Sequence, residues 1–91
     1  MARYRLSDDL LLQEVAGEAV LLNLKDGVYF SLDEVGTRMV RVFREHGDLG
    51  PAVEALEAEY EASQEQIRTD MVTLLEEMVS HGLAERLDPT G

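Results

Sequence analysis

Apolar and polar residues follow two different patterns along the chain, and the change comes near residue 32. Before that point, short runs rich in apolar residues are separated by turn residues, which is typical of strands. The runs are Leu10–Val15, Glu18–Leu24 and Val28–Leu32. Between the last two, Lys25–Gly27 predicts a hairpin turn, because an Asp-Gly pair readily adopts the positive φ that such turns need. The connections are too short for crossovers, so the pattern predicts a three-stranded antiparallel meander.

After residue 32 the apolar residues recur every three or four positions, which predicts three helices. Their expected inward-facing stripes are Val35, Met39, Val42 and Phe43 in the first helix, Val53, Leu56 and Tyr60 in the second, and Ile67, Met71, Leu74, Leu75 and Met78 in the third. Residues 3–6 are candidates for an irregular extension, and Leu83–Leu87 for a brief strand or an extended tail. The predicted fold class is α+β, with the strands first and the helices after them.

Residues at the expected helix ends support these boundaries. Candidate N-terminal residues are Asp33, Pro51 and the Ser63–Gln66 capping box, and candidate C-terminal residues are Gly47 and Gly82. Side-chain oxygens of Asp and Ser accept hydrogen bonds from the first free backbone N–H groups of a helix, and glycine readily takes the left-handed conformation that ends one.

Length and charge limit the possible functions. The 91 residues provide one modest core, so we expect a single domain over residues 1–91. A net charge of −11 disfavours nucleic acid and anionic membranes as partners, because both attract Lys and Arg. The chain has no apolar stretch long enough to span a bilayer and no start typical of a secretory signal. We therefore expect a cytoplasmic protein.

The residue types that carry most enzyme chemistry are few. Cysteine is absent, and both histidines, His46 and His81, lie next to a glycine at an expected helix end. A histidine in that place commonly interacts with the helix C-terminus. No metal-binding or phosphate-binding motif is present. We expect no catalytic residue, no metal site and no cofactor, so the protein is predicted not to be an enzyme.

The third predicted strand, Val28–Leu32, lies at an edge of the meander. It is aromatic and carries no charge and no proline. Edge strands that avoid pairing usually carry a charged residue or a proline. An edge without them is a template for a strand from another chain. The other possibility is that residues 1–7 or 83–87 of this same chain cover the edge, and the pattern alone does not decide between them.

Two stretches together resemble a known family. The segment from Glu18 to Gly36 is similar to the pattern G-x-x-hydrophobic-L-x-x-G-x-Y-F/Y-x-L-N-x-x-G of the PqqD family, the stand-alone form of the RiPP recognition element. The third helix is similar through Ile67, Asp70, Met71, Leu74, Leu75, Met78, Gly82 and Leu83. The resemblance covers about residues 5–87. It departs from the pattern at Asp33, where Asn is usual, and in the first helix, which has Phe43 but no Trp.

The resemblance implies a three-stranded sheet on a three-helix, winged-helix-like bundle. It also implies a leader-peptide-binding domain that is not a catalyst. Such domains bind the leader of a ribosomally made precursor peptide as an extra strand, between the third strand and the third helix, and deliver the precursor to a modifying enzyme. A small acidic free-standing member most resembles the lasso-peptide type, whose partner enzyme is a leader protease. The pyrroloquinoline-quinone type, which serves a radical enzyme, is the main alternative.

The expected peptide-binding residues come from two elements. The third strand contributes Val28, Tyr29, Phe30 and Ser31, with Val28 and Phe30 facing the third helix and Tyr29 flanking the added strand. The third helix contributes Arg68, Met71, Leu74 and Leu75 as the opposite wall. Asp70 matches a family position, and the resemblance leaves open whether it contacts the leader or caps locally.

Two other classes of protein share this order of elements. A winged-helix DNA-binding protein needs a basic recognition helix, yet Arg68 is the only basic residue of the third helix. A structural module would use the exposed third strand to form an obligate dimer.

Overall fold

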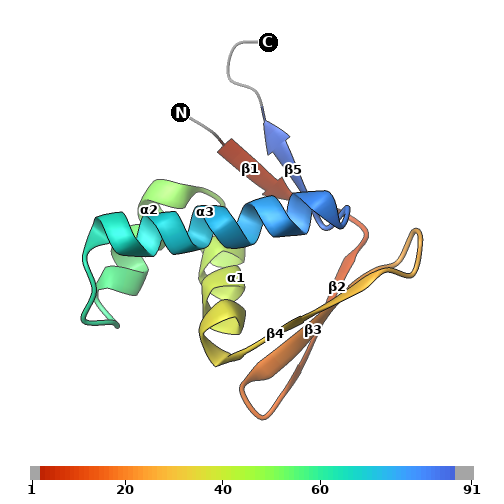
Figure 1. Cartoon of the computed structure of the whole chain (residues 1–91), viewed down its shortest axis with the longest axis horizontal. Helices are drawn as coiled ribbons and strands as arrows, with labels where there is room; N and C mark the ends of the chain where they lie inside the picture. Colours follow the sequence, from red (N-terminus) through yellow and green to blue (C-terminus); the bar gives the residue numbers. More distant parts are fainter. Residues whose placement is uncertain (1–2, 88–91) are drawn as a thin grey trace.

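The computed structural model describes residues 3–87 of the chain and has strands at both ends of a helical middle (Figure 1). The elements in order are β1 (Arg3–Leu6), β2 (Leu10–Val15), β3 (Glu18–Asn23), β4 (Tyr29–Leu32), α1 (Glu34–His46), α2 (Leu49–Glu57), α3 (Gln64–Ser80) and β5 (Ala84–Leu87). The expected α+β class, with a three-stranded antiparallel sheet and three helices, is confirmed. The likeness of the helices to a winged helix stays a prediction.

The meander has the order β2-β3-β4, with Leu21 of the central strand paired to both Leu12 and Phe30. Its second turn is the expected one, and Gly27 adopts a φ of 79° there. The last strand is shorter than predicted. The backbone N–H of Val28 donates to Oδ1 of Asp26 at 3.0 Å, within the turn, so the ladder of β4 begins only at Tyr29.

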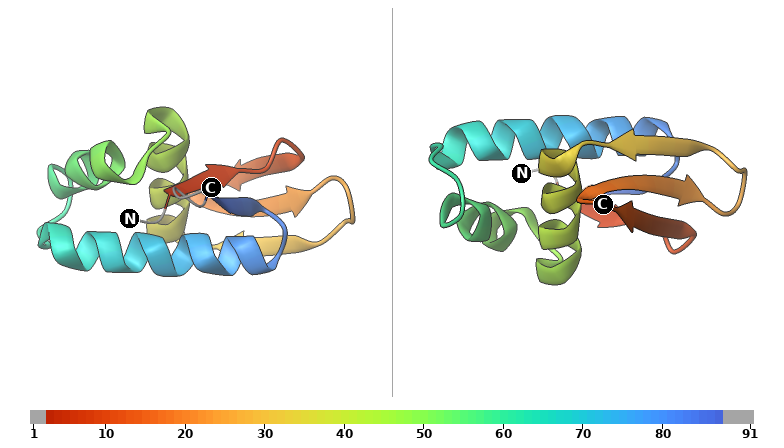
Figure 2. Two further views of the ribbon diagram at one scale, coloured as in Figure 1. Left: turned by 90° about the horizontal axis from the view of Figure 1, so that it is seen from above. Right: turned by 90° about the horizontal axis from the view of Figure 1, so that it is seen from below.

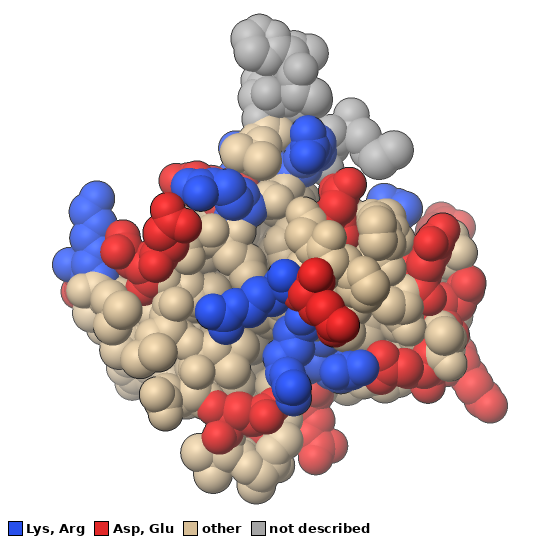
Figure 3. Space-filling view, turned by 180° about the vertical axis from the view of Figure 1, so that it is seen from behind, with Lys and Arg blue, Asp and Glu red and all other residues tan. Residues whose placement is uncertain are grey.

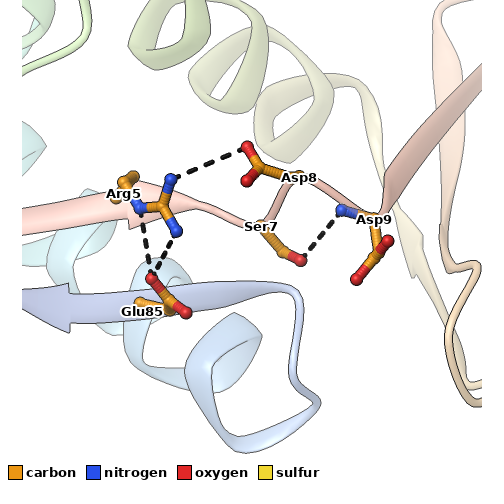
Figure 4. A network of polar contacts seen from close by, with 5 residues as sticks. All are labelled: Arg5, Ser7, Asp8, Asp9 and Glu85. Carbon is orange, nitrogen blue, oxygen red and sulfur yellow. Dashed lines mark hydrogen bonds and ion pairs between the residues drawn. The ribbon is translucent and has the colours of Figure 1, made fainter.

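The two terminal segments form a second sheet of their own. Strands β1 and β5 pair antiparallel, with Arg5 opposite Glu85. The Arg5 guanidinium donates to Oε2 of Glu85 at 2.8 Å and lies 3.6 Å from the Asp8 carboxylate at the corner that leads into β2 (Figure 4). At the same corner Ser7 Oγ accepts the backbone N–H of Asp9 at 3.1 Å. The extension and the tail of the sequence-based prediction are therefore strands that pair with each other.

Local polar contacts set the helix boundaries as expected. Asp33 caps α1 by accepting the Gly36 N–H at 2.7 Å, and Gly47 ends the helix with a φ of 76°. Ser63 caps α3 by accepting the backbone N–H of Gln66 at 3.1 Å. The Gln66 side chain does not complete the predicted capping box, since it donates to Asp70 instead.

The core lies between the inner face of the sheet, the three helices and the β1–β5 ribbon. Its fully buried large side chains come from every layer, among them Leu21, Val40, Leu56, Met71, Leu75, Met78 and Leu83. Burial of this apolar surface is the main force that holds the domain together. Among the described residues, no helix is long and apolar enough to cross a membrane.

Two residues expected in the helical stripes are exposed instead. Val35 is 48% exposed because it lies in the first turn of α1, at the end that points away from α3 (Figure 1). Tyr60 is 37% exposed because α2 ends at Glu57, three residues earlier, so the helical period no longer applies. The predicted burial of these two residues was wrong.

Candidate functional site

The outer edge of β4 has no partner strand within the described residues. In the meander, β4 pairs only with β3, through Phe30 opposite Leu21 and Ser31 opposite Val20. The segments proposed as an internal cover, residues 1–7 and 83–87, contribute the strands β1 and β5, which pair with each other. The backbone groups of this edge are therefore not paired by any strand of residues 3–87.

The backbone groups that face outward belong to Tyr29 and Ser31. Antiparallel ladders alternate between residue pairs that exchange hydrogen bonds and pairs that do not. The N–H of Asn23 donates to the carbonyl of Val28 at 2.8 Å, so the next bonded pair is Leu21 with Phe30. The N–H and C=O of Tyr29 and Ser31 then point away from β3, toward the open edge.

The other edge of the sheet is less available for pairing. Glu14 of β2 accepts hydrogen bonds from Arg41 of α1 at 3.1 and 3.3 Å, which ties that strand to the helix. Charged side chains on an edge disfavour pairing with another strand. In contrast, β4 carries no charged residue.

The C-terminal end of α3 lies beside β4. The rings of Phe30 and His81 are 5.0 Å apart between centroids and tilted by 56°. The His81 ring is held in place by a 2.8 Å contact between its Nδ1 and the carbonyl of Glu77. Figure 2 shows β4 and this end of α3 side by side in both views. An added strand at the edge of β4 would therefore have α3 as a neighbour.

A buried asparagine fixes this arrangement. Asn23 is 5% exposed and ends β3. Its Nδ2 donates to the carbonyl of Gly82 at 3.2 Å, and its Oδ1 accepts the N–H of Lys25 at 2.9 Å. One side chain thus joins the β3–β4 turn to the end of α3. Gly82 is required there, since its φ is 73° and an added Cβ would lie 2.8 Å from Asn23 Nδ2.

The candidate side chains of α3 lie on different sides of the helix. Residues three, four or seven apart share a side. Asp70 and Leu74 are therefore on the side of His81, which faces Phe30. Arg68 is on the opposite side, in line with Glu76, which binds the β1–β5 ribbon.

The predicted site residues also differ in accessibility. Tyr29, Ser31, Val28 and Asp70 are exposed, and Phe30, Leu74 and Arg68 are half-buried. Met71 and Leu75 are each 1% exposed and belong to the core. Asp70 and Leu74 therefore share the accessible side of the helix that ends at His81, the residue in contact with Phe30. The binding roles of all the predicted site residues stay predictions, and the observed burial of Met71 and Leu75 favours a packing role for these two.

Several arginine side chains form ion pairs with glutamates. Arg38 donates to Glu59 at 2.7–2.8 Å, and Arg86 donates through Nε to Glu76 at 2.9 Å. The hydrogen bond from Arg86 lowers the pKa of Glu76, with a further contribution from the hydroxyl of Tyr4. On the face opposite to that of Figure 1, Lys and Arg gather near the middle among Asp and Glu side chains (Figure 3). Their carboxylate partners compete with any phosphate ligand, in keeping with the prediction against nucleic acid.

Nothing among residues 3–87 resembles a metal centre, since no group of three or more His, Asp or Glu side chains could hold an ion. The chain has no cysteine. The hydroxyl of Ser80 lies 3.2 Å from Nδ1 of His81, but it donates to the backbone carbonyl of Glu77 at 2.6 Å, which is a helix-end contact. The predictions of no metal, no cofactor and no catalytic residue rest on these features.

Sequence reasoning missed Asn23 and His81 as parts of the site. Asn23 was assigned only to a strand, and His81 only to a helix end. The available signal was weak: an asparagine at the start of a turn commonly bonds its own backbone two residues on, as Asn23 does with Lys25. The contact of His81 with Phe30 joins residues 51 positions apart and leaves no local pattern.

Comparison with known proteins assigns the chain to a family. The family model of coenzyme PQQ synthesis protein D (PqqD) matches residues 18–84. The chain therefore belongs to the PqqD family, and the resemblance seen in its motifs is confirmed. The comparison with curated proteins finds no match.

Two solved structures share the fold. One is described as "TbiB1 in Complex with the TbiA(beta) Leader Peptide"; it is 31% identical, with a TM-score of 0.81 over 89% of this chain and 94% of that chain. The other is described as "Lasso peptide synthetase B1 complexed with the leader peptide"; it is 21% identical, with a TM-score of 0.77 over 90% and 96% of the two chains. The second likeness shows the fold alone.

Proposed function

We propose that the chain is a single leader-binding domain, a RiPP recognition element that binds the leader of a ribosomally made precursor peptide. The leader adds as a strand beside β4 and is delivered to a processing enzyme, the leader protease of a lasso-peptide pathway. The open edge of β4 is the observation that carries this proposal. Family membership and the leader complexes named for the two similar structures support it.

The energetics fit a binding domain for a flexible peptide. The outward backbone groups of Tyr29 and Ser31 offer four hydrogen bonds, each contributing about 0.5–1.5 kcal/mol. An apolar leader side chain packed against Phe30 and Leu74 adds about 1.5–3 kcal/mol. Ordering the peptide offsets part of this sum, so we expect micromolar or tighter affinity.

The test is fluorescence polarisation with the labelled leader of the chain's own precursor peptide. We expect saturable binding of the leader and none of a scrambled leader with the same composition. Glu57→Gln, on the exposed surface of α2, serves as a control that keeps normal affinity. Equal binding of the scrambled peptide, or no binding of the leader, would refute the proposal.

The protein itself is proposed to have no activity on the precursor. Mass spectrometry of the precursor incubated with the purified chain should show an unchanged mass. Cleavage or modification by the purified chain alone would contradict this part of the proposal.

A further inference from the structure

The outer face of the β2–β3–β4 sheet is apolar although nothing in the described residues covers it. A solvated sheet face normally carries polar residues at alternate positions. Here the ladder places Leu11, Leu22 and Tyr29 in one row across the three strands. Val20 follows in the next row, between Gln13 and Ser31, and Val15 stands opposite Glu18 in the last.

Several of these side chains are widely exposed. Val15 is 75% exposed, Tyr29 66% and Val20 40%. When the sheet is seen from below, no helix lies in front of its strands, and α1 stands at one end of them (Figure 2, right). A contiguous exposed apolar surface of this kind on a small soluble domain typically marks an interaction site.

The same face contains a hollow of about 370 Å³ near the turn between β2 and β3. Val15, Val20 and Ser31 are among the residues that line it. This volume has room for a large apolar side chain, and a central anchor in a pocket is characteristic of protein–protein interfaces.

We propose that this outer face is the docking surface for the enzyme that processes the bound precursor. The inference rests on the proposed function, because it assumes that a peptide occupies the edge of β4. Tyr29 belongs both to that edge and to the outer face, so the two surfaces are continuous. An enzyme docked here would lie beside the leader, where tethering raises the effective concentration of the precursor.

Charge indicates the chemistry of the partner surface. The outer-face positions carry one carboxylate, Glu18, and no Lys or Arg. Glu34 lies next to Gly17 at the same end of the sheet, with its carboxylate 3.1 Å from the position of an added Cβ. An apolar strip flanked by basic side chains is the complementary surface. A second copy of this chain fits less well, since each copy carries a net charge of −11.

The experiment measures binding of the immobilised chain to its purified leader protease, the processing enzyme of the proposed function, by biolayer interferometry. Val20→Lys and Val15→Lys each place a positive charge on the outer face, against the basic side chains of the partner. We expect either change to weaken binding of the protease tenfold or more. Ala58→Lys adds the same charge at an exposed position at the end of α2 and should bind normally. Circular dichroism establishes that the variants fold, and Val15 is exposed enough to tolerate the charge.

Leader binding distinguishes this inference from the proposed function. Val20→Lys should keep its leader affinity within about twofold, whereas Leu74→Glu, which lies on α3 and not on the outer face, should weaken leader binding and still bind the protease. The inference is overturned if the protease does not bind the wild-type chain, or if it binds Val20→Lys and Ala58→Lys alike. It is also overturned if the wild-type chain sediments as a dimer that Val20→Lys dissociates, because the face would then belong to a second copy.

Discussion

A proline at Ser31 tests the proposed leader site more sharply than a change of any side chain. The N–H of Ser31 points away from β3, so replacing it with proline removes no hydrogen bond of the existing sheet. Edge strands tolerate proline at such positions. The preceding residue, Phe30, already has the extended conformation that proline favours before it. The variant should therefore fold normally and lose only an outward donor.

The expected loss of affinity follows from the geometry. One of the four edge hydrogen bonds disappears, and the proline ring stands where the leader backbone would approach. The leader carbonyl that faced Ser31 is left without a partner, which costs about 1–3 kcal/mol in addition to the bond itself. We expect a total loss of about 2–3 kcal/mol, or roughly 30- to 150-fold in Kd.

Fluorescence polarisation with the labelled leader measures this loss, and thermal unfolding establishes the fold of each variant. Ser31→Ala is the matched control, because it removes the hydroxyl but keeps the N–H, and it should bind within about twofold of the wild type. If Ser31→Pro is folded and binds the leader normally, the leader does not pair with this edge.

The remaining predictions concern stability. Thr37→Val should raise the free energy of unfolding by about 1 kcal/mol in urea denaturation, because the buried Oγ1 of Thr37 has no hydrogen-bond partner among the described residues; a lower value would mean that the hydroxyl is paired. Asn23→Ala should lower the same quantity by about 2 kcal/mol, since it breaks two hydrogen bonds of a buried side chain, one to the carbonyl of Gly82 and one from the N–H of Lys25; an unchanged value would show that the link is not stabilising. Glu76→Gln should lower the melting temperature at pH 7. Because Arg86 lowers the pKa of Glu76 below its ordinary value of 4.5, this stabilisation is present above that pH and is lost as the pH falls through the folded-state pKa. The difference between variant and wild type should therefore shrink in acid, and a constant difference would exclude the ion pair as its cause.

Local signals predicted much of the fold. The turn at Gly27 and the caps at Asp33 and Ser63 depend on residues a few positions apart, and all three form as expected. The start of β4 was placed one residue early, because the Asp26 side chain binds the N–H of Val28 and the strand pattern gives no sign of that contact.

The pattern of apolar and polar residues could not predict pairing between segments that are distant in the sequence. The strands β1 and β5 join residues about 80 positions apart, so neither segment alone indicated its partner. For the same reason the sequence left open whether these segments cover β4. Only the structure shows that each is paired with the other.

The α3 half of the site was predicted less well than the β4 half. Helical periodicity identifies the apolar side of a helix but not which of its residues face a gap in the packing. Met71 and Leu75 lie at the centre of that side and are buried, whereas Leu74 lies at its border and is half-buried. The open edge of β4 was predictable because an uncharged aromatic strand at the end of a meander is itself the signal.

Amide hydrogen exchange, followed by NMR with and without a saturating leader peptide, tests the central claim most directly. The amides of Tyr29 and Ser31 point to the open edge and should exchange at least about tenfold more slowly in the complex. The amide of Phe30 already faces β3 and should change much less, which makes it an internal control. Unchanged exchange at Tyr29 and Ser31, with new protection at Leu12 and Glu14 on the opposite edge of the sheet, would contradict strand addition beside β4.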